Sequence, residues 1–185
     1  IARDEAIKRS GAQPGDAIFV TGQPGMAALG LADIQGKIKL PDTEQAVYRS
    51  KLEYPHPRLS EGQYLQSFVS SMIDISDGLS SEIMHLCKNS GVGCSLFEEK
   101  VPMDFQTKQM AEELNNNPLV AALNGGEDYE LLFTLPLDDY EKIKNDPDFT
   151  IIGHMTEAGE GINLVTTGGS SIPLEAQGWN HGKQK

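Results

Sequence analysis

Short apolar stretches alternate with amphipathic segments along this chain, and Gly, Pro and Asn residues separate them. Runs rich in β-branched and aromatic residues predict strands, which we expect at 17–21, 72–75, 92–97, 129–135, 149–155, 162–166 and 171–174. Apolar residues spaced three or four positions apart predict helices, which we expect at 26–34, 44–52, 61–68, 79–90, 106–115 and 138–144, with a loop over 35–43. Strands and helices alternate and the chain ends in a hairpin. This order favours an α+β layered domain with a mixed sheet over a purely parallel one.

The clearest local pattern is a strand, a turn and a helix in direct succession. The helix predicted over 79–90 has one apolar face, built from Leu79, Ile83, Leu86 and Cys87. Gly91 follows it as a C-cap. The turn before the helix therefore connects two well-predicted elements.

Two carboxylates, Asp74 and Asp77, lie where this strand meets its helix. Mg²⁺ takes carboxylate oxygens, usually one or two from the protein, and phosphates complete its shell. A helix N-terminus offers free N–H groups to a phosphate, and Ser76 and Gly78 let the backbone approach closely. The segment fits a metal–phosphate site. It also fits a plain capped helix in which Ser76 or Asp77 satisfies the first N–H groups.

A second acidic segment is Gly125-Gly126-Glu127-Asp128-Tyr129-Glu130, which precedes an apolar strand. A flexible Gly pair there presents acids that could hold a cationic or hydroxyl-bearing ligand, or a metal. The alternative is an acidic turn that only leads into the strand.

Arg9 and Trp179 are further candidates. Arg9 could contact phosphate bidentately or be a solvated residue of a linker. Trp179, the single Trp, could stack on an aromatic cation or close the core as an apolar plug.

Composition limits the other possibilities. The chain has 185 residues, of which 38% are apolar, enough for one packed core. Its net charge of −12 disfavours nucleic acid and anionic membranes as main partners, because basic surfaces bind both. No apolar run approaches the roughly 20 residues that span a bilayer. Cys87 and Cys94 are too few for a disulfide framework, and we expect reduced thiols in a cytoplasmic protein.

Familiar catalytic signatures are missing from the sequence. The four histidines show no zinc spacing. There is no phosphate-binding loop with a GK[ST] ending, no dinucleotide fingerprint and no Gly-x-Ser-x-Gly elbow.

In order, the segments of this chain resemble the C-terminal half of the thiamine-monophosphate kinases, a family of the aminoimidazole-ribonucleotide-synthetase-like superfamily. The resemblance rests on Arg9-Ser10-Gly11-Ala12, Pro14-Gly15-Asp16, Val20-Thr21-Gly22, Ile73-Asp74-Ile75-Ser76-Asp77-Gly78-Leu79, Ser90-Gly91-Val92-Gly93, Gly125-Gly126-Glu127-Asp128-Tyr129-Glu130-Leu131-Leu132-Phe133-Thr134 and Gly178-Trp179-Asn180-His181. It implies a layered α/β/α domain over 15–185. Residues 1–14 would then be a linker from a missing N-terminal ATP-binding half.

The resemblance also implies a reaction and a site. Members of the family transfer the γ-phosphoryl group of ATP directly to thiamine phosphate with Mg²⁺, and no side chain acts as a nucleophile. By position, Asp74 and Asp77 would hold Mg²⁺, Arg9 and Ser76 would bind ATP, and Glu127 and Trp179 would hold the thiamine moiety. The full-length protein would be a cytoplasmic homodimer, and this chain alone would be inactive.

The chain departs from the family pattern in two further segments. Residues 23–28 lack the small polar and acidic residues often found there, and Asn180-His181-Gly182 replaces the usual Asp-His-Phe ending. Two alternatives therefore stay open. One is a sister enzyme that uses ATP to activate another substrate. The other is a non-catalytic relative that binds nucleotide.

Overall fold

A computed structural model describes residues 6–103, 108–109 and 118–176. Its centre is a seven-stranded sheet in the order β2-β4-β1-β5-β3-β6-β7. The strands are β1 (Ala17–Thr21), β2 (Ser71–Asp74), β3 (Gly93–Phe97), β4 (Leu131–Leu135), β5 (Phe149–Thr156), β6 (Ile162–Val165) and β7 (Ser171–Pro173). β3 pairs with β6 in parallel, whereas every other described pair is antiparallel. The expected mixed sheet is confirmed.

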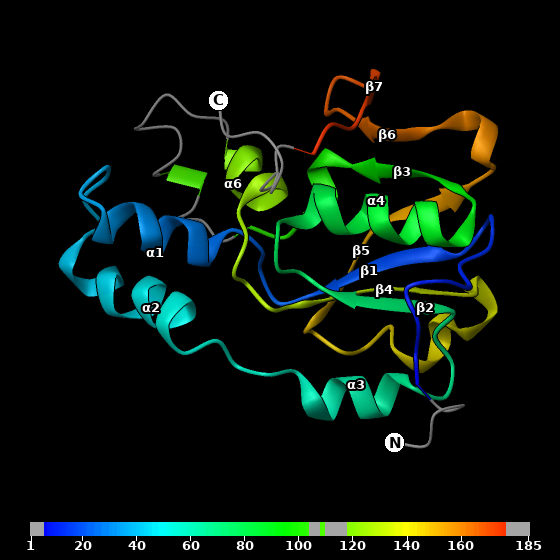
Figure 1. The fold of residues 1–185 in the computed structure, drawn as a ribbon, viewed down its shortest axis with the longest axis horizontal. Coiled ribbons are helices and arrows are strands. Elements are labelled where there is room, and N and C mark those ends of the chain that lie inside the picture. Colours follow the sequence, from blue (N-terminus) through cyan, green and yellow to red (C-terminus); the bar gives the residue numbers. More distant parts are fainter. Residues whose placement is uncertain (1–5, 104–107, 110–117, 177–185) are drawn as a thin grey trace.

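Both faces of the sheet are covered, which is why β1 is buried along its whole length (Figure 1). Side chains alternate between the faces of a strand. Ile18 and Val20 pack into the core beneath α4 (Leu79–Ser90), while Phe19 belongs to a second core with Leu65 of α3 (Leu59–Leu65). The domain therefore has the expected α/β/α layers.

A helical hairpin stands beside these layers (Figure 1). It consists of α1 (Met26–Ile34) and α2 (Asp42–Glu53), and it has a small core of its own around Leu40 and Tyr48. The two helices approach closely at Gly30, where a Cβ would lie 2.4 Å from the carbonyl oxygen of Tyr48. The hairpin is stabilised mainly by packing between its two helices rather than by packing on the sheet.

Several element boundaries differ from the sequence prediction. Helix α2 begins at Asp42, directly after Pro41, so the predicted loop is shorter. The helix predicted over 138–144 is the 3₁₀-helix η2 (Leu137–Lys142), a form typical of short segments. The fourth strand begins at Leu131 rather than at residue 129, because Tyr129 has a left-handed backbone with φ +52°.

Three short elements were not predicted as such. They are α6 (Pro118–Asn124), where the sequence shows a short apolar stretch, and the 3₁₀-helices η1 (Glu98–Lys100) and η3 (Ala158–Glu160). The C-terminal hairpin is confirmed by the antiparallel pairing of β6 with β7. The helix expected over 106–115 falls largely outside the described residues. Within the part of the chain that the structure describes, no helix is both long and apolar enough to cross a bilayer.

Candidate functional site

The strand–turn–helix unit has the expected form. Asp74 is the last residue of β2, and both Asp74 and Asp77 are exposed. Gly78 is the N-cap of α4 with φ +105°, and a Cβ there would lie 2.8 Å from the carbonyl oxygen of Leu123. Any other residue would be strained and would collide with the backbone at the C-terminal end of α6. The turn is therefore tight, and it projects both carboxylates into solvent.

A buried acid holds this turn from inside the helix. The carboxylate of Glu82 accepts hydrogen bonds through Oε1 from the Ser76 hydroxyl at 3.2 Å and from the Asp77 backbone N–H at 3.1 Å. No side chain caps α4 at Gly78. Among the described residues, neither Ser76 nor Asp77 accepts a hydrogen bond from the first N–H groups of α4 through its side chain, and Asp77 is exposed.

The second acidic segment lies directly against this turn. Backbone N–H groups of Glu127 and Tyr129 donate to the carbonyl oxygens of Ser76 and Ile75, both at 2.9 Å. The approach is close, since a Cβ on Gly126 would lie 2.3 Å from the Ser76 carbonyl oxygen. Two motifs about fifty residues apart in sequence thus form one site.

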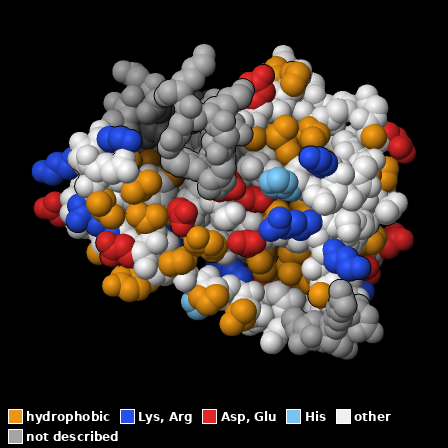
Figure 2. Space-filling model, in the orientation of Figure 1, with side chains coloured by type: hydrophobic (Ala, Val, Ile, Leu, Met, Phe, Trp, Pro, Cys, Tyr) orange, Lys and Arg blue, Asp and Glu red, His pale blue; other side chains and the backbone are white. Residues whose placement is uncertain are grey.

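Three exposed carboxylates and a phenol meet there. The Tyr129 hydroxyl donates to Glu127 Oε2 at 2.9 Å. This hydrogen bond, with partial burial and the charges of Glu127, Asp74 and Asp77, raises the pKa of Tyr129. Figure 2 shows acidic side chains gathered in the middle of this face, where β2 ends and α4 begins in Figure 1. The site is a concentrated negative patch.

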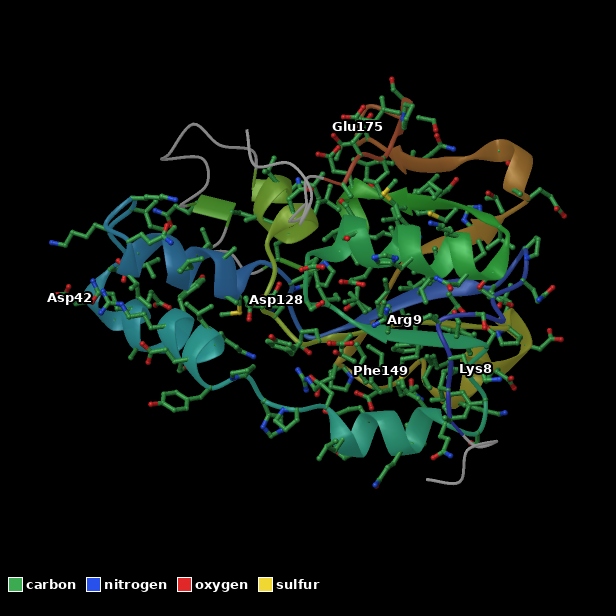
Figure 3. The ribbon with its side chains drawn as sticks, in the orientation of Figure 1. Lys8, Arg9, Asp42, Asp128, Phe149 and Glu175 are labelled. Carbon is green, nitrogen blue, oxygen red and sulfur yellow. The ribbon has the colours of Figure 1, made fainter. Side chains whose placement is uncertain are left out.

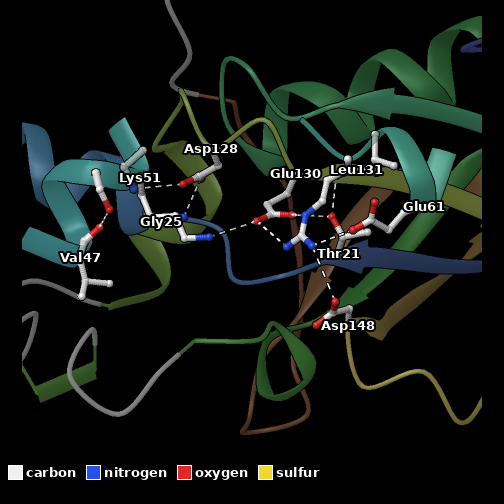
Figure 4. A network of polar contacts seen from close by, with 12 residues as sticks. Thr21, Gly25, Val47, Lys51, Glu61, Asp128, Glu130, Leu131 and Asp148 are labelled. Carbon is white, nitrogen blue, oxygen red and sulfur yellow. Dashed lines mark hydrogen bonds and ion pairs between the residues drawn. The ribbon is translucent and has the colours of Figure 1, made fainter. Parts of the chain in front are cut away.

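The other two acids of the segment point inward. Buried Asp128 accepts hydrogen bonds from the backbone N–H groups of Gly25 at 2.6 Å and Ala27 at 3.1 Å, at the start of α1 (Figures 3 and 4). Burial raises the pKa of Asp128 to about 6, although these two N–H donors act in the opposite direction. Asp128 therefore attaches the helical hairpin to the site.

Glu130 is the centre of a polar network in the interior (Figure 4). Its carboxylate accepts two hydrogen bonds from Arg58, at 2.7 and 3.1 Å, and one from the Thr21 hydroxyl at 2.6 Å. Lys51 of α2 lies 3.8 Å away. The hydrogen bonds to Glu130, which outweigh the effect of burial, raise the pKa of Arg58, so the guanidinium stays charged. This network ties β1, β4, α2 and the start of α3 together.

The sequence reasoning missed Arg58. One signal was available, because Arg58 directly precedes α3, and a positive charge is unfavourable at a helix N-terminus. An Arg at such a position indicates another partner. That partner is Glu130, 72 residues away in sequence.

Arg9 runs along the edge of the sheet. The carbonyl oxygen of its neighbour Lys8 accepts a hydrogen bond from the N–H of Met72 in β2 at 3.0 Å, and Figure 3 shows both residues along this edge. Arg9 itself is exposed. Arg9 therefore lies in a segment beside β2, the edge strand that ends at Asp74. Trp179 lies outside the described residues.

The donor chemistry of the site suits a magnesium ion bound through phosphate. Within the described residues no three His, Cys, Asp or Glu side chains are grouped to hold a metal. Mg²⁺ does not need such a cage, because one or two carboxylates with substrate phosphates and water are enough. Asp74 and Asp77 are two exposed carboxylates, and the charges of both contribute to the raised pKa of Tyr129. These two acids therefore fit Mg²⁺.

The described cavities lie elsewhere. The larger, of about 570 Å³, and a smaller apolar one of about 340 Å³ both flank α3 and the segment at 6–10. Neither is lined by Asp74, Asp77 or Glu127.

Comparison with known proteins identifies the family of this chain. Residues 13–164 match the family model "AIR synthase related protein, C-terminal domain", and the chain belongs to this family. It is similar to thiamine-monophosphate kinase of Salmonella typhimurium, with 38% identity over 98% of this chain and 57% of the relative. The chain spans about half the length of the curated relatives it matches.

Solved structures agree. The structure "AaThiL complexed with AMPPCP and TMP" matches with a TM-score of 0.81 and 33% identity, over 95% of this chain and 54% of that chain. A hydrogenase maturation protein HypE in complex with ATP matches with a TM-score of 0.70 and 20% identity, over 95% of this chain and 55% of the other. The second likeness shows the fold alone. The resemblance to the kinase family noted in the sequence is confirmed.

Proposed function

We propose that the protein containing this chain transfers the γ-phosphoryl group of ATP to thiamine phosphate and forms thiamine diphosphate. The observation that carries this proposal is the backbone pairing of the segment at Glu127 with the turn at Ser76, which brings acids from both motifs to one exposed site. Relatives named thiamine-monophosphate kinase support it, as does the related structure described with AMPPCP and TMP.

In this proposal each group at the site has a distinct task. Asp74 and Asp77 would hold Mg²⁺, and the ion would supply positive charge that neutralises the phosphates during in-line transfer. Ser76 and Arg9 contact ATP. Glu127 faces the cationic thiamine moiety, together with Trp179. Phosphoryl transfer needs alignment and charge neutralisation more than a nucleophile. The exposed acids can neutralise phosphate charge only through a bound cation.

The proposal extends to the state of the protein. We expect a cytoplasmic homodimer in which residues 1–14 link this domain, residues 15–185, to an N-terminal ATP-binding half. We also expect the 185-residue chain alone to show no turnover, because in this proposal the N-terminal half supplies much of the nucleotide and substrate site.

The test uses the complete gene product with Mg-ATP and thiamine phosphate, and it follows ADP and thiamine diphosphate together. We expect equal amounts of both products in the wild type and neither in Asp77→Asn. Asp138→Asn is the matched control, because Asp138 is an exposed acid at the far end of β4; its rates should match the wild type.

Other outcomes would contradict the proposal. ADP without thiamine diphosphate would indicate a sister enzyme with another acceptor. Neither product from a folded protein that still binds nucleotide would favour the non-catalytic relative.

A further inference from the structure

Tyr129 is a residue to which the sequence assigns no task, yet the structure places it within the acidic site. Its side chain is half-buried, and its hydroxyl donates to Glu127 Oε2 at 2.9 Å. Glu127 itself is exposed. An exposed Glu side chain samples several rotamers. The hydrogen bond from Tyr129 selects one of them.

The backbone of both residues adopts an unusual conformation. Glu127 has φ +68° and Tyr129 has φ +52°, and among the described residues they are the only non-glycine positions with positive φ. A bulky residue with positive φ is a clear outlier. Such conformations persist only where the surroundings impose them, and they concentrate at functional sites.

The surroundings that impose this conformation are on both sides of the segment. N–H groups of Glu127 and Tyr129 are held by the turn at Ile75 and Ser76. Between and after them, the Asp128 and Glu130 side chains are anchored in the interior. Glu127 and Tyr129 are therefore held at the same acidic site as Asp74 and Asp77.

The electrostatics favour this pairing of acid and phenol. Glu127 lies in a negative patch, where the hydrogen bond from the Tyr129 hydroxyl stabilises its ionised carboxylate. The hydrogen bond to Glu127 raises the pKa of Tyr129, so the phenol keeps its proton and remains the donor at neutral pH. With Oε2 engaged, Oε1 of Glu127 has a defined direction toward a ligand.

We propose that Tyr129 is a positioning residue that orients the Glu127 carboxylate toward the cationic ring of the phosphate-accepting substrate. This inference rests on the proposed function, and it adds a residue that sets the affinity for the acceptor. Tyr129 acts through Glu127. Its loss should therefore weaken binding of the acceptor and leave ATP binding unchanged.

The experiment compares Tyr129→Phe with the wild type in the complete gene product, with the KM for thiamine phosphate and for Mg-ATP measured separately. Phe keeps the ring and removes only the hydroxyl. Loss of one hydrogen bond to a charged group should raise the KM for thiamine phosphate about five- to tenfold. The KM for Mg-ATP should stay within about twofold of the wild type.

Two further variants separate positioning from a structural role. Tyr64→Phe removes an equivalent hydroxyl bond, to the Lys142 carbonyl oxygen at 2.8 Å, away from the site, and both KM values should be unchanged. The double variant Glu127→Gln/Tyr129→Phe should bind thiamine phosphate no more weakly than Glu127→Gln alone, because the phenol acts only through the carboxylate.

The outcomes distinguish the two proposals. An active wild type with an unchanged KM in Tyr129→Phe would overturn the positioning role and leave the proposed function standing. Equal rises in both KM values, or fully additive losses in the double variant, would also overturn it in favour of a structural role. A wild type that forms no thiamine diphosphate would refute the proposed function, and the inference that rests on it.

Discussion

The five acids of the two motifs differ in one respect, which is whether protein groups satisfy them. Asp128 and Glu130 are buried, and each accepts at least two hydrogen bonds from distant parts of the chain. Asp74, Asp77 and Glu127 are exposed, and the only protein donor recorded for their carboxylates in the described residues is the Tyr129 hydroxyl.

The buried and exposed acids should therefore serve different purposes. A buried carboxylate must find partners within the protein because an unpaired charge in the interior is costly. An exposed carboxylate in a negative patch gains little from the protein and gains most from a cation. The inner acids should therefore determine stability, and the outer acids should determine ligand binding.

The largest effect should follow from breaking the ion pair at Glu130. Glu130→Gln removes the carboxylate that accepts two hydrogen bonds from the Arg58 guanidinium, only 13% exposed, and leaves it with Glu61 at 2.9 Å. Removing one member of a buried pair costs about 3 kcal/mol or more, and we expect this loss in urea denaturation followed by circular dichroism. Asp139→Asn breaks the exposed pair with Lys142 and should cost about 0.5 kcal/mol. Similar losses in both variants would contradict the distinction.

Asp128 should make stability depend on pH. Its native pKa of about 6 lies above the ordinary value of 3.8. The native state therefore keeps a proton that the unfolded state releases, and stability falls as the pH rises from about 4 through 6. Each pKa unit corresponds to about 1.4 kcal/mol, so the fall should approach about 3 kcal/mol. Glu130 favours the proton and Lys51 disfavours it.

The check compares urea denaturation of the wild type and Asp128→Asn at pH 4 and pH 7. Asn does not titrate, so the advantage of the wild type should shrink as the pH rises. A constant difference between the two proteins would show that the native pKa of Asp128 is not raised.

The contact between the two motifs should be sensitive to a single methyl group. Gly126→Ala places a Cβ 2.3 Å from the Ser76 carbonyl oxygen, and such overpacking costs about 1–3 kcal/mol. Gly159→Ala is the control, because nothing lies within 4 Å of its Cβ position, and its unfolding temperature should not fall. Equal unfolding temperatures of the two variants would mean that the motifs are not in close contact.

The smallest effect on stability should come from an outer acid. Asp77→Asn removes an exposed charge from a patch of like charge, and we expect a change within about 0.5 kcal/mol of the wild type. The same variant should lose the rise in unfolding temperature that Mg-ATP causes in the complete protein. A large loss of stability, with the Mg-ATP effect intact, would show that Asp77 contributes to stability rather than to ligand binding.

Much of the fold follows from local sequence patterns. The strand, turn and helix around Asp74 to Gly78 were predicted because β-branched residues, a Gly turn and one apolar helical face are adjacent in sequence. Predictions failed where backbone geometry depends on remote contacts. The fourth strand starts at Leu131 because Tyr129 has a left-handed backbone conformation. Hydrogen bonds to Ile75 and Ser76 hold the segment that contains Tyr129.

The candidate site divides in the same way. Asp74, Ser76, Asp77 and Glu127 were singled out from the sequence, and the structure brings them together. Arg58 was missed, because no neighbouring residue in the sequence indicates that its partner is Glu130. Trp179 lies outside the described residues, and its role remains a prediction.

Most strands and helices could be predicted from the sequence, because they depend on neighbours along the chain, and so could the positions of the acids at 74, 77 and 127–130. The order Glu-Asp-Tyr-Glu at 127–130 does not indicate which acids face inward. That depends on tertiary contacts, because Thr21, the start of α1 and Arg58 before α3 satisfy Asp128 and Glu130, whereas Glu127 stays on the surface with Asp74 and Asp77.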